Sequence, residues 1–421
     1  MKERKWVILT VTIMLIGFYF STSAMATEPI ILGLPTPLAI LECQHARHAA
    51  EMAVEEINAT GGVNVGGTKR PFKLIATDTR DGAPGIPVSE ALMAYEKLIL
   101  RQKPKAIVTG FYASEALLAS MDITSKHKLP YIATIPMSPK FQKKIVENYE
   151  AYKYLFRLSI NAVHFFQAYT GVLNAINQEF GFNRAAIIVE EALYTKAIAA
   201  MTAKWLTGKG WEVTVNETFP KGTSDYSAPL LKVRNTRARV IVYVCSLPQS
   251  VIFVEQWRTM KIPAVLIGAV PPLVGEETWK VHKGKVEGLI NLTEAGIFPL
   301  KAIPESITFY EKFKKRVGTG PDGSHGVGGA YESVYIFKDA IEEAGSLDPD
   351  KMVASIEKTD RKSCLGRIKF GKDHQAAFGK DPKEGAVPVI FQWQKPGTRV
   401  AIYPKEVAEG SIQLPEWMSK K

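Results

Sequence analysis

The sequence predicts an α/β protein with two successive units, each a parallel β-sheet covered by helices. Three observations lead to this prediction. Short apolar segments alternate with amphipathic segments along most of the chain, a rhythm that builds parallel sheets with helices on both faces. The rhythm is interrupted at residues 154–159 and then restarts. The 421 residues are enough for two or three domains with sizeable cores.

The first unit alternates four strands with three helices. Strands are expected at 30–34, 72–78, 105–111 and 129–134, and helices at 42–59, 90–100 and 114–126. The first helix ends in the stretch AVEEINATGGV, where alanines, Val54 and Ile57 recur at helical spacing. Gly61 and Gly62 can adopt the left-handed backbone that ends a helix.

The second unit begins after the strand-like segment YLFRLS at 154–159. Helices are expected at 162–179, 194–208, 226–235 and 248–260, with strands at 184–190, 211–219, 239–244 and 263–268. The tail is less regular: it shows strands at 286–293, 366–370, 387–394 and 399–404 and helices at 304–317, 328–344 and 349–358. The segment QKPGTR joins the last two strands as a hairpin turn. Glycine-rich GSHGVGGAYES reads as a flexible lead into a helix.

The first 26 residues have the features of a cleaved signal peptide. Three basic residues precede an apolar run at 6–20, and Ala24-Met25-Ala26 is a suitable cleavage site. The apolar run is shorter than the roughly 20 residues that cross a bilayer, so an uncleaved anchor is the weaker alternative. We therefore expect export to the periplasm and a mature chain that begins near Thr27.

The charge and the cysteines limit the classes of protein. The net charge is +11, and removing residues 1–26 with their three basic and one acidic side chains leaves +9. The basic residues are scattered and form no arginine-rich arm, so we expect no nucleic-acid partner. Cys43, Cys245 and Cys364 are too few for a disulfide framework, although one bridge among them is possible.

Catalytic and cofactor motifs are missing from the sequence. We find no phosphate loop, no H-E-x-x-H, no C-x-x-C and no nucleophile elbow, so we expect neither an enzyme nor a cofactor. One cluster leaves a metal site possible, because Cys43, His45 and His48 are close enough in the sequence to share a soft metal. Solvated histidines beside a small helix-entry residue are the simpler interpretation, and we expect no metal.

Several segments together resemble the type I periplasmic solute-binding proteins, specifically the branched-chain amino-acid (leucine/isoleucine/valine) binding family of ABC importers. The resemblance covers essentially the whole mature chain. The most specific segments are AAEMAVEEINATGGV (49–63) and FPKGTSDYSAPLLKVR (219–234). Weaker ones are LIATDTRD, IVTGFYASEAL, LPYIAT, FRLS and VEEALY.

The resemblance implies two lobes around a ligand cleft, joined by a hinge of three strands. We assign residues 27–157 and 288–363 to the N-terminal lobe and residues 158–287 and 364–421 to the C-terminal lobe. The hinge crossings should lie near 156–159, 287–292 and 364–368. Small ligands in such folds lie outside the carboxyl ends of the strands, which agrees with the predicted sheets.

The resemblance also implies ligand-binding residues in both lobes. Ser114 should bind the ligand's carboxylate at the start of a helix, where N–H groups favour an anion, although it could also be a plain helix cap. Tyr194 should close over the ligand. The remaining expected contacts are Tyr112, Ala113, Thr134, Ile135, Leu247 and Val270.

The chain departs from the family where the family carries the acid that pairs with the ligand's ammonium. That position falls near Val270, and GAVPPL contains no acid. Because a buried ammonium without a partner is costly, either Glu190 or Glu191 replaces the acid, or the ligand is not an α-amino acid. An aromatic or aliphatic carboxylate or an amide would suit the apolar cleft.

We therefore expect the periplasmic substrate-binding component of an ABC importer. It would be a monomer that captures a small carboxylate-bearing solute by hinge closure and delivers it to a membrane permease. A sensor that presents the same closure to a signalling receptor is the alternative.

Overall fold

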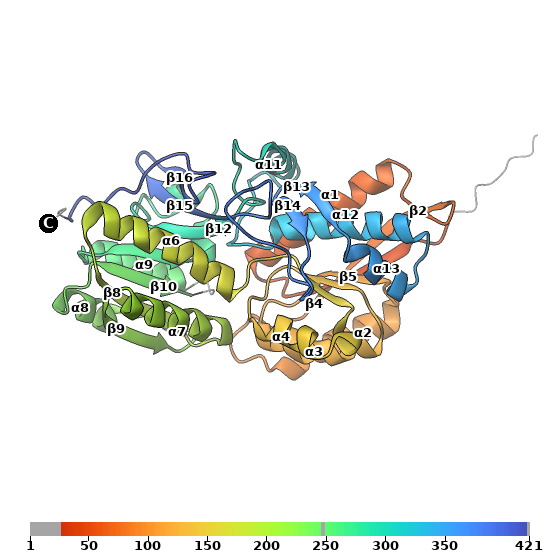
Figure 1. The fold of residues 1–421 in the computed structure, drawn as a ribbon, viewed down its shortest axis with the longest axis horizontal. Coiled ribbons are helices and arrows are strands. Elements are labelled where there is room, and N and C mark those ends of the chain that lie inside the picture. The colour runs from red at the N-terminus through yellow and green to blue at the C-terminus, as the bar shows by residue number, and fades with distance from the viewer. Residues whose placement is uncertain (1–26, 246–248, 419–421) are drawn as a thin grey trace, which may run out of the picture.

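The structure, a computed structural model, describes residues 27–245 and 249–418. The predicted signal peptide and Leu247 lie outside the described residues. Two α/β lobes lie side by side along the long axis of the molecule (Figure 1). In the described part of the chain, no helix is both long and apolar enough to span a membrane.

The first lobe is built on a parallel sheet of five strands in the order β4-β1-β5-β6-β7. Its strands are β1 (Ile30–Thr36), β4 (Phe72–Asp78), β5 (Ala106–Thr109), β6 (Tyr131–Ala133) and β7 (Leu155–Arg157). The helices between them are α1 (Leu41–Ala59), α2 (Val88–Gln102), α3 (Ser114–Lys126), α4 (Lys140–Glu147) and α5 (Tyr149–Tyr152). Gly61 and Gly62 end α1 with φ of 96° and 81°, as the sequence predicts.

The second lobe contains a sheet of seven strands in the order β16-β15-β12-β11-β10-β8-β9. Its strands are β8 (Arg184–Glu190), β9 (Glu212–Phe219), β10 (Val240–Val244), β11 (Val265–Ala269), β12 (Ile290–Glu294), β15 (Pro388–Gln394) and β16 (Thr398–Tyr403). The helical segments are α6 (Ala162–Phe180), α7 (Leu193–Gly208), α8 (Ser227–Asn235), α9 (Ser250–Thr259), η1 (Pro271–Leu273) and α10 (Thr278–Val281). β15 runs antiparallel to both β12 and β16, so this sheet is mixed.

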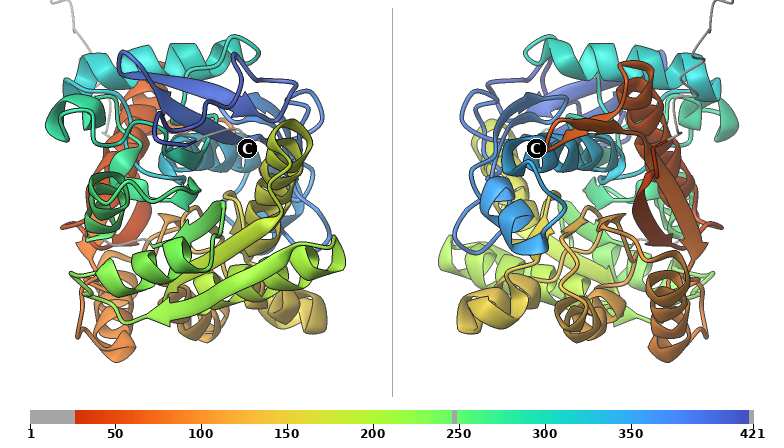
Figure 2. Two further views of the ribbon diagram at one scale, coloured as in Figure 1. Left: turned by 90° about the vertical axis from the view of Figure 1, so that its left-hand side faces the viewer. Right: turned by 90° about the vertical axis from the view of Figure 1, so that its right-hand side faces the viewer.

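The segment between β12 and β15 returns to the first lobe. It contains α11 (Pro304–Val317), α12 (Val327–Ala344), α13 (Pro349–Ile356) and the hairpin of β13 (Asp360–Ser363) and β14 (Gly366–Lys369). α12 packs along α1, and Figure 2 shows these segments together at one end of the molecule. A second hairpin, β2 (Val63–Val65) and β3 (Thr68–Arg70), follows α1 and was not predicted.

The chain therefore passes between the sheets three times: after β7, after β12, and between β14 and β15. The first and third passages lie together, because Arg157 N–H donates to the His374 carbonyl and the Ala376 N–H donates to the Arg157 carbonyl, each at 2.9 Å. Residues 290–294 were assigned to the N-terminal lobe but form β12 of the second sheet. The other predicted lobe boundaries stay predictions.

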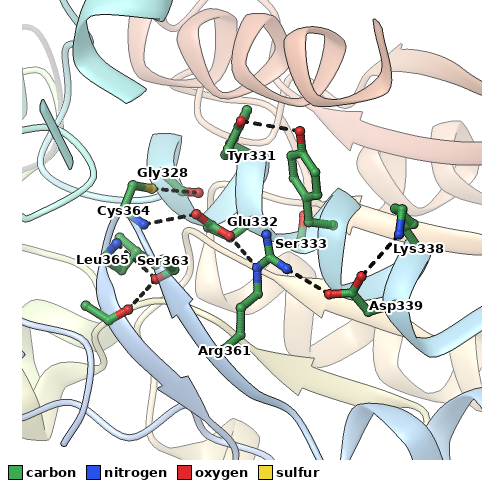
Figure 3. Close-up of polar contacts among 12 residues, drawn as sticks. Gly328, Tyr331, Glu332, Ser333, Lys338, Asp339, Arg361, Ser363, Cys364 and Leu365 are labelled. Carbon is green, nitrogen blue, oxygen red and sulfur yellow. Dashed lines mark hydrogen bonds and ion pairs between the residues drawn. The ribbon is translucent and has the colours of Figure 1, made fainter. Parts of the chain in front are cut away.

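An ion pair between the half-buried Arg361 and the buried Glu332 fixes the β13–β14 hairpin to α12. Arg361 donates to Glu332 at 2.8 Å and to Asp339 at 2.7 Å (Figure 3). The Glu332 carboxylate also accepts the Cys364 N–H at 3.0 Å, and its side chain is only 4% exposed. All three cysteines are buried, and none of them forms a disulfide bridge in the structure.

Candidate functional site

A cavity lies between the two lobes at the carboxyl ends of their strands. Residues 81–82, 112–115 and 135–137 line it from the first lobe, in loops that follow β4, β5 and β6. The second lobe contributes Ala192, Tyr194, Lys221, Ala269 and Pro271, and Ser324 and His325 complete the lining. The empty space, including its opening to solvent, is about 600 Å³. This position fits a small-molecule site.

The first-lobe wall is organised by the carboxylate of Asp81. Its Oδ2 accepts the backbone N–H groups of Tyr112 at 2.8 Å and Ala113 at 2.6 Å. Its Oδ1 accepts the Thr79 hydroxyl at 2.6 Å. Asp81 is 9% exposed, and its burial raises the pKa of the carboxyl. Asp81 thus links the loop after β4 to the loop after β5, across the intervening strand β1.

Ser114 is the first residue of α3 and connects two cavity loops. Its hydroxyl oxygen accepts the Ser138 N–H at 3.2 Å, which joins the loop after β5 to the loop after β6. The first i→i−4 bond of α3 runs from the Leu117 N–H to the Ala113 carbonyl. The N–H groups of Ser114 and Glu115 precede that bond and belong to the positive end of the helix. This end of the cavity is suited to an anion.

Glu115 connects the two lobes at the cavity. Its Oε1 accepts the backbone N–H of Leu193 at 3.4 Å, a long hydrogen bond to the start of α7 in the second lobe. Tyr194, the next residue, is half-buried. It lines the cavity from the second lobe, whereas Ser114 lines it from the first. The charged side chains among the lining residues are Asp81, Glu115 and Lys221. Apolar side chains, including Ile135, Met137 and Pro271, make up most of the rest.

His325 anchors the loop before α12 to the cavity wall. Its Nε2 lies 2.5 Å from the Ile135 carbonyl, which can only accept, so Nε2 carries the proton. Nδ1 then accepts the Ser324 hydroxyl at 2.6 Å. Burial lowers the pKa of His325 to about 4, so the imidazole is neutral at neutral pH. The loop predicted as a flexible lead is therefore a buried, hydrogen-bonded part of the site.

Two buried carboxylates from different lobes bind the backbone of this loop. Glu42 of α1 accepts the N–H groups of Ser324 and His325, each at 3.0 Å. Glu294, the last residue of β12, accepts the Gly326 N–H at 2.6 Å. Burial raises the pKa of Glu42 to about 7 and that of Glu294 to about 8, well above their ordinary value of 4.5.

Replacing Glu294 with glutamine should flatten part of the pH dependence of stability. Because its pKa is higher in the folded state, Glu294 binds more proton there than in the unfolded state between about pH 4.5 and 8, so folding stability falls as pH rises through this window. Glutamine has the shape of the protonated acid and no charge. Urea unfolding at pH 5, 6.5 and 8 should show Glu294→Gln gaining stability relative to the wild type as pH rises. A constant difference across these pH values would contradict this assignment.

The predicted ligand contacts fall into three groups. Tyr112, Ala113, Ser114, Ile135 and Tyr194 line the cavity. Thr134 and Val270 are fully buried and are not among the lining residues. Leu247 lies in the segment that the structure leaves undescribed.

Thr134 and Val270 lie just behind the residues that line the cavity. Thr134 is next to Ile135, and a side-chain carbon built on Gly329 of α12 would approach the Thr134 side chain to 3.2 Å. Val270 exchanges backbone hydrogen bonds with the Asn291 side chain at 2.9 and 3.0 Å, while its neighbours Ala269 and Pro271 reach the cavity.

The acids predicted to replace the lost ammonium partner do not line the cavity. Glu190 ends β8 and is fully buried, whereas Glu191 is exposed and forms an ion pair with Lys196 at 2.8 Å. Asp81, which lies in the segment LIATDTRD, is the buried carboxylate that reaches the cavity and was missed. Its signal was its position three residues after a strand of the parallel sheet.

The cluster of Cys43, His45 and His48, for which a shared metal was the weaker alternative, does not assemble as a metal site. His45 accepts the Asp322 N–H through Nδ1 at 2.9 Å, and His48 contacts Glu51 at 3.2 Å. Within residues 27–245 and 249–418, no three histidine, cysteine or acidic side chains are grouped as metal ligands.

Comparisons with known proteins agree with this architecture. A family model described as periplasmic binding protein matches residues 34–379. The Leu/Ile/Val-binding protein homolog 7 of Brucella melitensis is 24% identical over 98% of this chain and 100% of its own length.

Two solved structures share the fold at low identity. The branched-chain amino acid transporter substrate binding protein of Streptococcus pneumoniae, in complex with isoleucine, has a TM-score of 0.72 and 18% identity, covering 92% of this chain and 100% of its own. A solute binding protein of an ABC transporter from R. palustris, in complex with benzoate, has a TM-score of 0.71 and 14% identity, covering 93% and 99%.

Proposed function

Because this chain belongs to the periplasmic binding protein family, we propose that it is the substrate-binding component of an ABC importer. It captures a small carboxylate-bearing solute, either an amino acid or an aromatic or aliphatic acid or amide, and delivers it to a membrane permease without changing it chemically. The observation that carries this proposal is the cavity lined by loops from both lobes at the carboxyl ends of their strands. Relatives whose names include leucine, isoleucine and valine, and a neighbour in complex with benzoate, support the ligand class.

The ligand's carboxylate is proposed to lie at the start of α3. The N–H groups of Ser114 and Glu115 and the Ser114 hydroxyl would donate to it, and the positive end of the helix would stabilise its charge. The apolar part of the ligand would then pack against Ile135 and Met137 of the first lobe and Pro271 of the second. Tyr194 would cover it from the second lobe.

Binding is coupled to closure of the lobes. A ligand between Ser114 and Tyr194 contacts both lobes only when they are closed, so it favours the closed state over the open one. The three passages between the sheets provide the hinge about which the lobes move. The closed form is then the species that a permease recognises.

The proposal includes export and a monomeric state. Residues 1–26 would act as a cleaved signal peptide that directs the chain to the periplasm. Mass spectrometry of the protein recovered from a periplasmic extract should show an N-terminus near Thr27. A chain that retains residues 1–26 would contradict cleavage.

A thermal-shift screen of residues 27–421, unfolded and refolded to remove bound ligand, tests the proposed function. The panel contains amino acids, aromatic and aliphatic carboxylates, and their amides. A solute at about 100 times its dissociation constant adds about 2.7 kcal/mol to stability, which raises the melting temperature by several degrees. At least one panel member should produce this shift. A chain that melts at the same temperature with every member would contradict the proposed ligand class.

A further inference from the structure

Arg157, the last residue of β7, carries a buried positive charge without an acid in direct contact. Its side chain is fully buried, and its Nη2 donates to the Ser138 carbonyl at 2.8 Å. The guanidinium lies over the Phe141 ring at 4.6 Å. Its Nε and Nη1 have no hydrogen-bond partner, and no carboxylate within residues 27–245 and 249–418 forms an ion pair with it. A buried charge in this state is costly, so its presence needs an explanation.

The solute cavity needs positive charge beyond what its own lining supplies. Among the described lining residues, Asp81 and Glu115 carry carboxylates. Lys221 carries an exposed ammonium, and the His325 imidazole is neutral. Two acids and one cation leave the lining negative, which opposes an anionic solute. The start of α3 offsets this charge only in part, because a helix end is equivalent to about half an elementary charge.

A single residue, Ser138, links Arg157 to the start of α3. The Ser138 carbonyl accepts from the guanidinium, and the Ser138 N–H donates to the Ser114 hydroxyl oxygen at 3.2 Å. The Ser114 oxygen thus accepts from the protein, and its own proton is left to donate to a solute. Two such hydrogen bonds and the residue between them place Arg157 on the order of 10 Å from an anion at Ser114. At an effective dielectric constant of about 20, two unit charges at this separation change a binding constant roughly tenfold.

The charge of Arg157 acts on the cavity from this position. Burial is the main cause of the low pKa of His325, and the charge of Arg157 lowers that pKa further. Burial also lowers the pKa of Arg157 itself to about 9, against the opposing effect of Asp373, so the guanidinium is charged at neutral pH. Asp373 is half-buried in the third passage between the lobes. It is therefore the acid that partly offsets the charge of Arg157.

We propose that Arg157 determines the specificity of the cavity for anionic solutes, acting through Ser138 and the Ser114 hydroxyl. It is a positioning residue that does not touch the solute: its guanidinium holds the Ser138 backbone, and its charge opposes that of the lining carboxylates. This inference rests on the proposed function and deepens it. The proposed function admits both acids and amides, and Arg157 selects the acids.

Isothermal titration calorimetry with pairs of a carboxylate and its amide tests this role. The pairs are L-leucine with L-leucinamide, benzoate with benzamide, and 4-methylpentanoate with 4-methylpentanamide. In the wild type, the carboxylate of the tightest-binding pair should bind more tightly than its amide. Arg157→Met should weaken binding of that carboxylate about tenfold and change the affinity for the amide by less than about twofold. Arg157→Lys keeps the charge and should keep most of the preference.

Asp373→Asn should have an effect of the opposite sign, which a general disturbance of the fold would not produce. Removing the partial offset to Arg157 should raise the preference for the carboxylate at least about twofold. The matched control is Asp381→Asn. Both aspartates are half-buried, and each accepts the backbone N–H two residues further along, from Gln375 at 3.2 Å and from Lys383 at 2.9 Å. Asp381 does not act on the charge of Arg157, so its replacement should leave the preference unchanged.

The outcomes separate this inference from the proposed function. Melting temperatures establish which variants are folded. Equal losses of carboxylate and amide binding in folded Arg157→Met would make Arg157 a purely structural residue and overturn the inference. An unchanged or lower preference in Asp373→Asn would also overturn it, and this variant remains a test if Arg157→Met does not fold.

The wild type alone gives two further outcomes. Amides that bind as tightly as their carboxylates would overturn the role of Arg157 and leave the importer function intact. Binding of no member of any pair would remove the proposed ligand class and this inference with it.

Discussion

Replacing Arg361 with alanine should lower the free energy of unfolding by about 3–5 kcal/mol, the usual cost of leaving a buried charge without its partner. Arg361 is the cation beside Glu332, whose carboxylate is 4% exposed (Figure 3). In Arg361→Ala, the Cys364 N–H is the remaining donor to the Glu332 carboxylate that the structure shows. It also removes the link to Asp339 and the contact of the guanidinium with the Tyr335 ring at 4.9 Å.

Urea unfolding of Arg361→Ala measures this effect, and Lys362→Ala is its matched control. Lys362 is the next residue and forms an ion pair with Glu305, but its side chain is 77% exposed. Exposed pairs contribute about 1 kcal/mol or less, so the control should unfold close to the wild type. If both variants lose the same free energy of unfolding, the Arg361–Glu332 pair contributes no more to stability than an exposed ion pair.

Replacing Tyr194 with alanine should weaken binding of the captured solute by about 30-fold or more, since buried aromatic anchors commonly contribute 2 kcal/mol or more. Tyr194 lines the cavity from the start of the second-lobe helix α7. Its loss removes a large contact surface that only the closed state presents to the ligand. The side chain is half-buried, so we expect the fold itself to tolerate the change.

Titration of the solute identified in the thermal-shift screen into Tyr194→Ala and Tyr194→Phe measures this contribution. Phenylalanine retains the ring and should keep most of the affinity. A full loss in Tyr194→Phe would instead make the hydroxyl the important group. Unchanged affinity in Tyr194→Ala would mean that the ligand does not reach this part of the second lobe.

The regular elements were predictable because their signals are local. Helical spacing of apolar residues, paired glycines and short apolar strands placed α1, α3, β4 and β8 within a few residues of their bounds. The hairpin β2–β3 and strand β13 were missed because these strands have three or four residues, too few to show a period, whereas β14 was predicted at 366–370. Residues 290–294 were placed in the N-terminal lobe, but as β12 they pair with β15, which lies about 100 residues further along the chain.

The candidate site was predictable only in part, for a similar reason. Loops after β5 and β6 followed from the parallel sheet, and Ser114 and Ile135 do line the cavity. Thr134 and Val270 lie in the right loops but face the packed interior, a distinction of one residue that sequence spacing does not resolve. His325 reaches the cavity from a segment far along the chain, and no local sequence pattern predicts this contact.

Asp81 shows how a contact between loops changes the interpretation of a site. From the sequence, either Glu190 or Glu191 replaces the acid missing near Val270, or the ligand is not an α-amino acid, and both of these acids belong to the second lobe. The structure brings Asp81 across from β4 to the start of α3, where it holds the loop of Tyr112 and Ala113. The same side chain therefore positions a loop that lines the cavity.

The central claim is that a small solute closes the two lobes on each other. Small-angle X-ray scattering of residues 27–421, with ligand removed and then with a saturating amount of the solute found in the screen, tests it most directly. The account predicts a smaller radius of gyration in the presence of the solute, and no such compaction with a panel member that causes no thermal shift. Saturation by the solute with an unchanged radius of gyration would contradict capture by closure.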